Sequence, residues 1–371
     1  MTDILTPLPT ELLHIIAFHL GILSPTDIAN LALTSTTLHS ALLSTPFDKD
    51  QHYATAGLHY CITHSHSRAA SLALSRGYGH IVQQSRRDQQ SGVFELSTIA
   101  LAAKNGLAAL IPALFTHPLV DPADDSNYVI RFAANGGHAD TVALLLADPR
   151  VDPADDSNYA IRMASKHGHT ETVALLLADP RVDPADDSNY AIRMASRHGH
   201  TETATLLLAD PRVNPAVSSN YAIRWVSRSG HTDTVALLLA DPRVDPADDS
   251  NYAIRMASQN GHTETVALLL ADPRVNPAAS SNYAIRMASK HGHTETLALL
   301  LTDPRVDPAA SSNYAIRMAS KYGHTETVTL LLTDPRVNPA DKSNVAICAA
   351  ALNGHTSTVA LLLADPRVTP P

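Results

Sequence analysis

One 31-residue unit, repeated eight times in register, dominates the chain. Its first residue recurs as Val120, Val151, Val182, Val213, Val244, Val275, Val306 and Val337, which open repeats 1 to 8, and a ninth copy begins at Val368. A fixed period of about 20–50 residues is typical of an array of stacked units. Each unit can bury its apolar face only against its neighbours. The repeat therefore predicts an array with a long surface and no obvious pocket.

The clearest copy, Val151–Arg181, predicts a first helix over Tyr159–His167. Ser157 or Asn158 is suited to cap its start by accepting hydrogen bonds from the free backbone N–H groups. Ile161, Met163 and Ala164 supply an apolar face. Gly168 follows where a left-handed cap is easiest for glycine, so the helix should end there.

The same copy predicts a second helix after Gly168. Thr170 is suited to cap it, and Glu171 would lie in its first turn, where the helix dipole favours a carboxylate. Val173, Leu176 and Leu177 have the i, i+3, i+4 spacing of a buried stripe. Pro180 cannot continue a helix, so Asp179-Pro180-Arg181 should end it.

This unit resembles the ankyrin repeat. The resemblance lies in Ala164-Ser165-Lys166-His167-Gly168-His169 and in Leu175-Leu176-Leu177, and it covers roughly residues 89–371. It implies an all-α solenoid of stacked helix pairs whose function is to bind other proteins. The hairpin glycine of the family is replaced by Asp-Pro-Arg, so we expect helix pairs without a well-formed β-hairpin between them.

The repeat boundaries predict the domain organisation. Residues 91–119 form a degenerate capping repeat, in which Gly106 lies one period before Gly137 and Pro112 should shorten or kink the second helix. Residues 120–367 form the eight repeats, and residues 368–371 a tail. Residues 46–90 form a linker that can include a further degenerate repeat, and residues 1–45 a separate helical module.

Candidate target-binding residues come from the positions that vary between copies. Variation concentrates at the predicted loop tip and just before the glycine, which in ankyrin-like arrays adjoin the concave binding face. The alternative is drift at solvated positions. Trp225 stands where five other copies have methionine and is the best single hot-spot candidate. The candidates are Asp155, Asp156, Lys166, Asp186, Asp187, Arg197, Trp225, Asp248 and Asp249.

Three side chains recur with the period and favour structural roles. Methionine at the position of Met163 is expected in the core between stacked helices rather than on a binding face. Arginine at the position of Arg162 is expected to pair with a loop aspartate or a neighbouring carbonyl. Histidine at the position of His169 invites a metal hypothesis, but packed helices lie about 8–10 Å apart and zinc needs each ligand at about 2 Å. We therefore predict a structural turn role for the histidine and no metal site.

Residues 8–42 predict three short helices. The first begins near Thr10, and Ser24-Pro25-Thr26-Asp27 provides a favourable start for the second. A third begins at Thr34 or Ser35. Three helices in about 40 residues bury little core alone, so such a module usually needs a partner.

This module resembles an F-box. The matching residues are Leu8-Pro9, Glu11-Leu12-Leu13, Ile16, Leu20, Asp27-Ile28, Leu31, Thr34-Ser35 and Leu38. The resemblance implies docking on the small linker subunit of a cullin-based (SCF) ubiquitin ligase. The residues implied in that contact are Leu8, Pro9, Leu12, Ile16, Leu20 and Leu31. The alternative is that residues 1–45 only cap the array.

Composition narrows the function classes. A net charge of −9 argues against nucleic acid as the main ligand. There is no apolar run of about 18 residues, so no membrane span is expected, and the N-terminus lacks the pattern of a secretory signal. Cys61 and Cys348 are the only cysteines, which fits an intracellular protein, cytoplasmic or nuclear.

These observations predict an SCF substrate receptor in which the F-box-like module docks on the ligase and the array holds an unknown target protein. No nucleophile–base pattern or phosphate-binding loop is present, so we expect no enzymatic activity and no cofactor. The alternatives are an ankyrin-repeat scaffold with no ubiquitin-ligase role and an enzyme that binds a divalent metal through its acidic loops.

Overall fold

A computed structural model of the chain describes residues 86–87, 94–95, 97–118 and 120–368. The predicted three-helix module at residues 1–45 lies outside these described residues, as do its ligase-contact residues Leu8, Pro9, Leu12, Ile16, Leu20 and Leu31 and most of the predicted linker. Helices joined by short turns and loops make up most of the described part. Two short strands, β1 (Arg86–Arg87) and β2 (Phe94–Glu95), pair antiparallel before the first described helix.

The predicted capping repeat consists of α7 (Thr98–Lys104), a 3-10 turn at Ala108–Leu110 and the short helix α8 (Ile111–Phe115). Pro112 lies at the start of α8, which has only five residues. The expectation that this proline shortens the second helix is therefore confirmed.

Each of the eight repeats contributes two helices. The first helices are α9 (Asp124–Asn135), α11 (Asp155–His167), α13 (Asp186–Arg197), α15 (Val217–Ser229), α17 (Asp248–Asn260), α19 (Ala279–His291), α21 (Ala310–Tyr322) and α23 (Asp341–Leu352). The second helices are α10 (Ala139–Leu146), α12 (Thr170–Ala178), α14 (Thr201–Ala209), α16 (Thr232–Leu239), α18 (Thr263–Ala271), α20 (Thr294–Leu301), α22 (Thr325–Leu332) and α24 (Thr356–Leu363). No strand occurs within 97–118 or 120–368, as the Asp-Pro-Arg sequence led us to expect.

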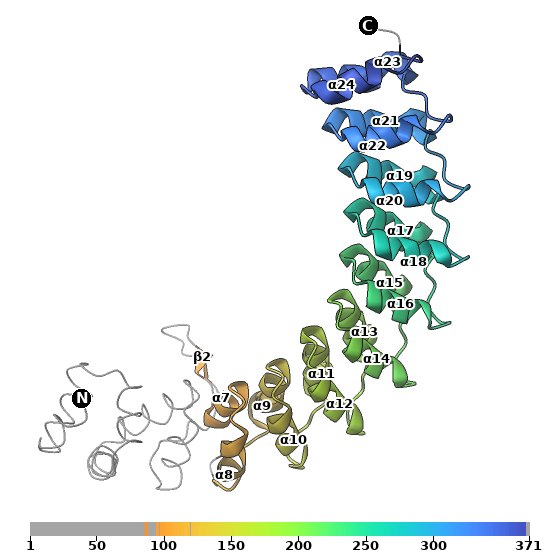
Figure 1. Cartoon of the computed structure of the whole chain (residues 1–371). Coiled ribbons are helices and arrows are strands. Elements are labelled where there is room, and N and C mark those ends of the chain that lie inside the picture. The colour runs from red at the N-terminus through yellow and green to blue at the C-terminus, as the bar shows by residue number, and fades with distance from the viewer. Residues whose placement is uncertain (1–85, 88–93, 96, 119, 369–371) are drawn as a thin grey trace, which may run out of the picture. The chain divides into compact units, whose positions relative to one another are not determined.

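The described chain divides into two units. The first comprises the described residues up to Ala164 together with residues 171–183, and the second comprises residues 165–170 and the described residues from Pro184 onward. In the first unit, α7 packs against α9 and α10 packs against α8. In the second unit, each first helix from α13 to α23 packs against the next, and the second helices from α14 to α24 do the same. Figure 1 shows these as two parallel rows within the second unit.

The core is built from small and branched apolar side chains, as the low aromatic content requires. In repeat 5, Val244, Ile254 and Leu269 are at most 1% exposed, and Ala253, Ala257 and Val266 are fully buried beside them. Met163, Met194, Met256 and Met287 are buried, which confirms the core role predicted for the methionines, although Met318 is only half-buried. The predicted stripe needs one correction, because Leu177 is half-buried and the buried member beside Val173 and Leu176 is Thr172.

The glycine between the two helices of a repeat has a left-handed backbone. Gly168 has φ +74° and Gly261 has φ +75°, which confirms the predicted cap. Glycine is also required by packing, because a Cβ built on Gly261 would lie 2.5 Å from Nδ1 of His293 in the following repeat. None of the described helices is long and apolar enough to cross a membrane.

Candidate protein-binding surface

From α11 to α23, the first residue of each first helix is followed by three consecutive residues in the left-handed region. In α17 these are Asp249 (φ 50°), Ser250 (φ 55°) and Asn251 (φ 61°). Short polar side chains enter this region at the lowest cost among non-glycine residues, because they hydrogen-bond locally. The recurring Asp-Asp-Ser-Asn and Ser-Ser-Asn sequences therefore encode a left-handed turn rather than a simple N-cap.

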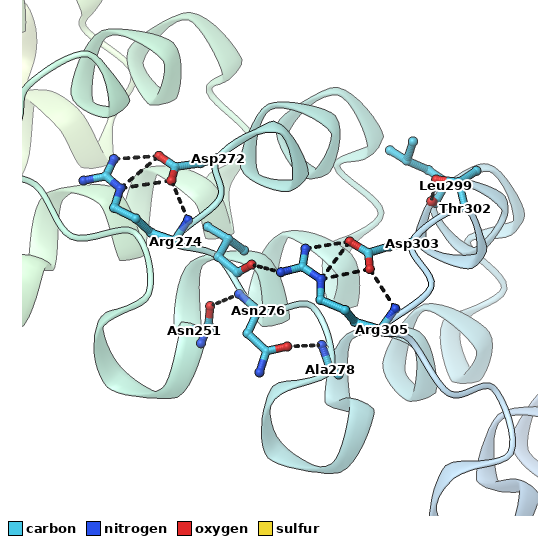
Figure 2. A network of polar contacts seen from close by, with 10 residues as sticks. Asn251, Asp272, Arg274, Asn276, Ala278, Leu299, Thr302, Asp303 and Arg305 are labelled. Atoms are coloured by element: carbon cyan, nitrogen blue, oxygen red, sulfur yellow. Dashed lines mark hydrogen bonds and ion pairs between the residues drawn. The ribbon is translucent and has the colours of Figure 1, made fainter.

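The asparagine that ends this turn joins one repeat to the next. The side-chain Oδ1 of Asn251 accepts a hydrogen bond of 2.6 Å from the backbone N–H of Asn276, whose own Oδ1 accepts one from the N–H of Ala278 (Figure 2). The same inter-repeat bond occurs from Asn127 through Asn313. The predicted capping role of Asn158 is thus corrected, since its Oδ1 accepts from the backbone of Asp183 in the next repeat.

The arginine that ends each repeat fixes the loop that follows the second helix. Arg305 donates to both carboxylate oxygens of Asp303, with its terminal nitrogen 2.6 Å from Oδ2, and also to the carbonyl of Val275 at 2.9 Å (Figure 2). The side-chain hydrogen bond from this arginine holds the pKa of Asp303 below its usual value. The equivalent bonds in Arg274 and Asp272 lower the pKa of that carboxyl in the same way.

The recurring histidines link the repeats through their second ring nitrogen. Nε2 of His293 donates to the carbonyl of Gln259 at 3.0 Å, and His262 does the same to Arg228. The predicted structural role is confirmed, but the histidine joins two repeats rather than only forming a turn. No cluster of three or more histidine, cysteine or acidic side chains at metal-binding distance occurs among the described residues.

Threonine makes a further inter-repeat contact that corrects its predicted role. The hydroxyl of Thr170 shares a hydrogen bond of 2.9 Å with the hydroxyl of Thr203, one repeat later. In the following repeat, the N-cap residue of α14 is His200, which makes no side-chain capping bond. The equivalent threonine, Thr201, is the first residue of that helix. Glu171 lies in the first turn of α12, as predicted.

Arginines of the first helices stack with tyrosines along the array. The guanidinium of Arg255 lies over the ring of Tyr252 in its own repeat and over that of Tyr283 in the next, 5.7 and 5.3 Å from the centroids. Its terminal nitrogen also donates to the carbonyl of Asp249. The expected pairing with carbonyls is confirmed, and the stacking is an addition that the sequence pattern of Tyr and Arg three residues apart could have indicated.

Most of the predicted target-binding acids already have partners within the array. Asp155 accepts from Asn127, and Asp156 pairs with Arg131. In the later repeats Asp248 accepts from Asn220, and Asp249 pairs with Arg224 at 2.6 Å. Asp186 and Asp187 bond to each other through the Asp187 N–H and the Asp186 carboxylate. Asp155, Asp156, Asp248 and Asp249 are therefore placed to hold neighbouring repeats together.

The other predicted residues include two that the fold brings together. Arg197, at the end of α13, places its guanidinium 4.9 Å from the ring centroid of Trp225 in α15. Arg228, one helical turn after Trp225, approaches the same ring at 4.9 Å. Tyr221 and Tyr252 flank the indole with centroid distances of 5.5 and 6.4 Å. We call these five residues the Trp225 cluster; sequence reasoning missed Arg228 and the tyrosines.

The Trp225 cluster lies on the surface. Trp225 and both tyrosines are half-buried, whereas Arg197 and Arg228 are exposed. Arg197 also donates to the hydroxyl of Tyr221 at 3.2 Å. Lys166, the remaining predicted residue, is half-buried and occupies the same repeat position as Arg197 and Arg228, and its carbonyl accepts from His200. The last turn of the first helices is therefore basic in repeats 2 to 4.

The histidines that follow Lys166 and Arg197 have lowered pKa values, so they stay neutral more readily than usual. Partial desolvation lowers the pKa of the exposed His198, and the adjacent Arg197 lowers it further. Partial desolvation and Lys166 lower the pKa of His167 in the same way. The positive charge at this edge is therefore carried by lysine and arginine.

Comparison with known families identifies the array. The model described as ankyrin repeats (3 copies) matches residues 130–218, 192–281, 223–312 and 285–370, which together span well over half of the chain. No F-box model matches the N-terminal residues. No curated protein matches the chain. The stacked helix pairs and this match together show that the chain belongs to the ankyrin-repeat family, which indicates a function in protein–protein interaction.

Proposed function

We propose that the chain is a substrate receptor of a cullin-type ubiquitin ligase, in which residues 1–45 dock on the linker subunit and the array holds a target protein. The ankyrin fold is typically a non-enzymatic interaction scaffold. In this proposal the chain positions its target, and the transfer of ubiquitin belongs to its partners.

The observation that carries the proposal is the presence, in one chain, of an ankyrin array and an F-box-like sequence. The array supplies a surface for a target, with the exposed Arg197 and Arg228 both against the ring of Trp225. The N-terminal sequence supplies Leu12 and Ile16 on one face of a predicted helix, as contact with a partner requires. Neither feature alone favours a receptor over a plain scaffold.

The test is co-purification of the full chain with the linker subunit of the ligase. The wild-type chain should bind stoichiometrically, and Leu12→Asp/Ile16→Asp should abolish binding, because carboxylates would replace buried apolar contacts. His14→Asp is the matched control, since His14 lies on the opposite face of the predicted helix and should leave binding unchanged.

Folding of the array must be checked in each variant, because a collapsed protein would also fail to bind. Circular dichroism and the thermal midpoint should be the same for all three proteins. A wild-type chain that does not bind the linker subunit would overturn the receptor role and leave a scaffold.

A further inference from the structure

We propose that the Trp225 cluster binds an acidic, proline-rich segment of the target protein, in an extended conformation with a carboxylate at every third residue. This inference rests on the target-binding half of the proposed function and names the chemistry of the target. It does not depend on whether residues 1–45 bind a ligase.

The first argument is the availability of charge. The arginines that end the repeats, such as Arg212 and Arg243, each form an ion pair with the aspartate two residues earlier. Arg224 pairs with Asp249. In contrast, no carboxylate of the described residues forms an ion pair with Arg197 or Arg228, and both side chains are exposed. Two guanidinium groups are therefore free to bind carboxylates from outside.

The second argument is preorganisation. Both guanidinium groups stack on the Trp225 indole, and Arg197 is further fixed by its bond to the Tyr221 hydroxyl. The carbonyl of Arg228 accepts hydrogen bonds from Asn260 and His262 of the next repeat, which fixes the backbone of that residue. A planar guanidinium held in this way offers paired donors to a carboxylate with little further loss of entropy.

The third argument is spacing. Because each guanidinium lies 4.9 Å from the same ring centroid, the two groups lie within about 10 Å of each other. A polyproline II segment rises about 3.1 Å per residue with three residues per turn, so side chains three apart lie on one face at about 9 Å. The spacing of carboxylates at every third residue therefore falls within this upper limit, as binding to both arginines requires.

The fourth argument is the aromatic surface. Trp225, Tyr221 and Tyr252 are half-buried and adjacent. Proline-rich segments in the polyproline II conformation dock in aromatic-lined grooves. Prolines between the acidic residues would pack on the exposed parts of these rings while the carboxylates bind the arginines.

A single-stranded nucleic acid is the competing anionic ligand, because it also favours arginine and stacked aromatic rings. Charge argues against it. The opposite end of the same helices carries acids, with Asp186 and Asp187 in repeat 3 and Asp248 and Asp249 in repeat 5. A short acidic peptide can lie along the basic edge alone, whereas a longer phosphate backbone would approach the acidic edge.

The test is fluorescence anisotropy with the full chain and a labelled peptide of roughly 15 residues made of Glu-Pro-Pro triplets. The same peptide with glutamine for glutamate measures the contribution of the carboxylates, and a thymidine oligonucleotide of about 15 nucleotides measures the nucleic acid alternative. We expect the glutamate peptide to bind, with an affinity that falls as salt is raised. The glutamine peptide should bind at least about tenfold more weakly, since it leaves the charged donors without anionic partners.

Two variants are supplied by the repeat itself. Trp225→Met restores the residue that Met194 and Met256 provide at this position, and Arg228→Gln introduces the residue that Gln259 provides one repeat later. Both substitutions are compatible with the fold, because neighbouring repeats already contain them. Each should weaken binding of the glutamate peptide about tenfold. Lys321→Gln, at the equivalent position in repeat 7, should change it less than about twofold, as expected for a site away from the hot spot.

Three results would overturn the proposal: no binding of the glutamate peptide, binding that Trp225→Met leaves unchanged, or tighter binding of the oligonucleotide that Trp225→Met weakens. The linker subunit does not enter this experiment. Failure of ligase docking and failure of the acidic-segment site are therefore separate outcomes.

Discussion

Asn251 of repeat 5 accepts, through its side-chain Oδ1, a hydrogen bond of 2.6 Å from the backbone N–H of Asn276 in repeat 6. The bond joins residues that are 25 positions apart, and the asparagine that makes it has a left-handed backbone. One residue therefore satisfies two demands, a turn within its own repeat and a link to the next.

Asn251→Ala should destabilise the array by about 1–3 kcal/mol, because it leaves a backbone N–H without its partner and places a side chain that cannot hydrogen-bond locally in the left-handed region. Asn251→Gly removes the same hydrogen bond but adopts the left-handed region freely. Urea unfolding followed by circular dichroism should rank the stabilities as wild type, then glycine, then alanine. An alanine variant as stable as wild type would contradict the role given to this side chain.

A second prediction concerns the glycine between helices. Gly261→Ala should be more destabilising than Gly354→Ala. Both glycines have φ +75°, so both substitutions carry the left-handed cost of about 1–2 kcal/mol. Only Gly261 faces the ring of His293, whereas a Cβ on Gly354 would meet nothing within 4 Å. Thermal unfolding of the two variants compares a crowded site with an open one.

Gly354 lies in the last full repeat, and unfolding of an end repeat is less coupled to the rest of the array than unfolding of an internal one. A double variant at two internal positions avoids this comparison between an end repeat and an internal repeat. Gly261→Ala/His293→Ala should be more stable than the sum of the two single effects predicts, since the alanine methyl no longer meets the imidazole. Strict additivity of the two changes would show that the ring does not limit this position.

The regular helices and their ends could be predicted from sequence because their causes are local. Gly168 and Pro180 act on the backbone of their own repeat, and the spacing of Val173 and Leu176 reveals the buried face. The roles of Asn158 and Thr170 could not be predicted in the same way, because both fit the pattern of a helix cap while their partners lie one repeat away. A capping preference describes a residue and its nearest neighbours, not a contact across an interface between repeats.

The candidate binding surface could also be predicted only where its causes are local to one repeat. Trp225 stood out because it departs from the repeat, and Arg197 because it lies at a variable position. That the two meet depends on the packing of α13 against α15, which brings residues 28 positions apart to within 4.9 Å. The acids at Asp248 and Asp249 also vary between copies, yet their partners, Asn220 and Arg224, show that variation here accompanies contacts inside the array.

A third prediction concerns acid stability and the aspartate that opens each Asp-Pro-Arg turn. Hydrogen bonding from Arg274 lowers the pKa of Asp272 in the folded state. A lowered carboxyl pKa contributes stability that is present above the unfolded value of about 3.9 and is lost as the pH falls through the folded value. Asp272→Asn should therefore reduce the urea midpoint at neutral pH and have progressively less effect below about pH 4.

The exposed Glu264 provides a control, because it lies in the first turn of α18, the helix that ends directly before Asp272. Glu264→Gln should change the midpoint much less at neutral pH, because surface charges contribute little to stability. An effect of Asp272→Asn that stays constant from neutral pH down to about pH 2 would show that the ion pair with Arg274 is not its cause.

The last prediction concerns a histidine whose charge the fold disfavours. His291 is exposed, but partial desolvation lowers its pKa, and the neighbouring Lys290, His293 and His324 lower it further. Because the folded state binds a proton less readily than the unfolded state, the contribution to stability is fully present above the unfolded pKa of about 6.5 and is lost as the pH falls below it. His291→Asn introduces the residue that Asn260 provides in repeat 5, without a titrating group. The variant should lose less stability than wild type between about pH 7 and pH 5, and an unchanged pH slope in urea unfolding would exclude His291 as a source of acid sensitivity.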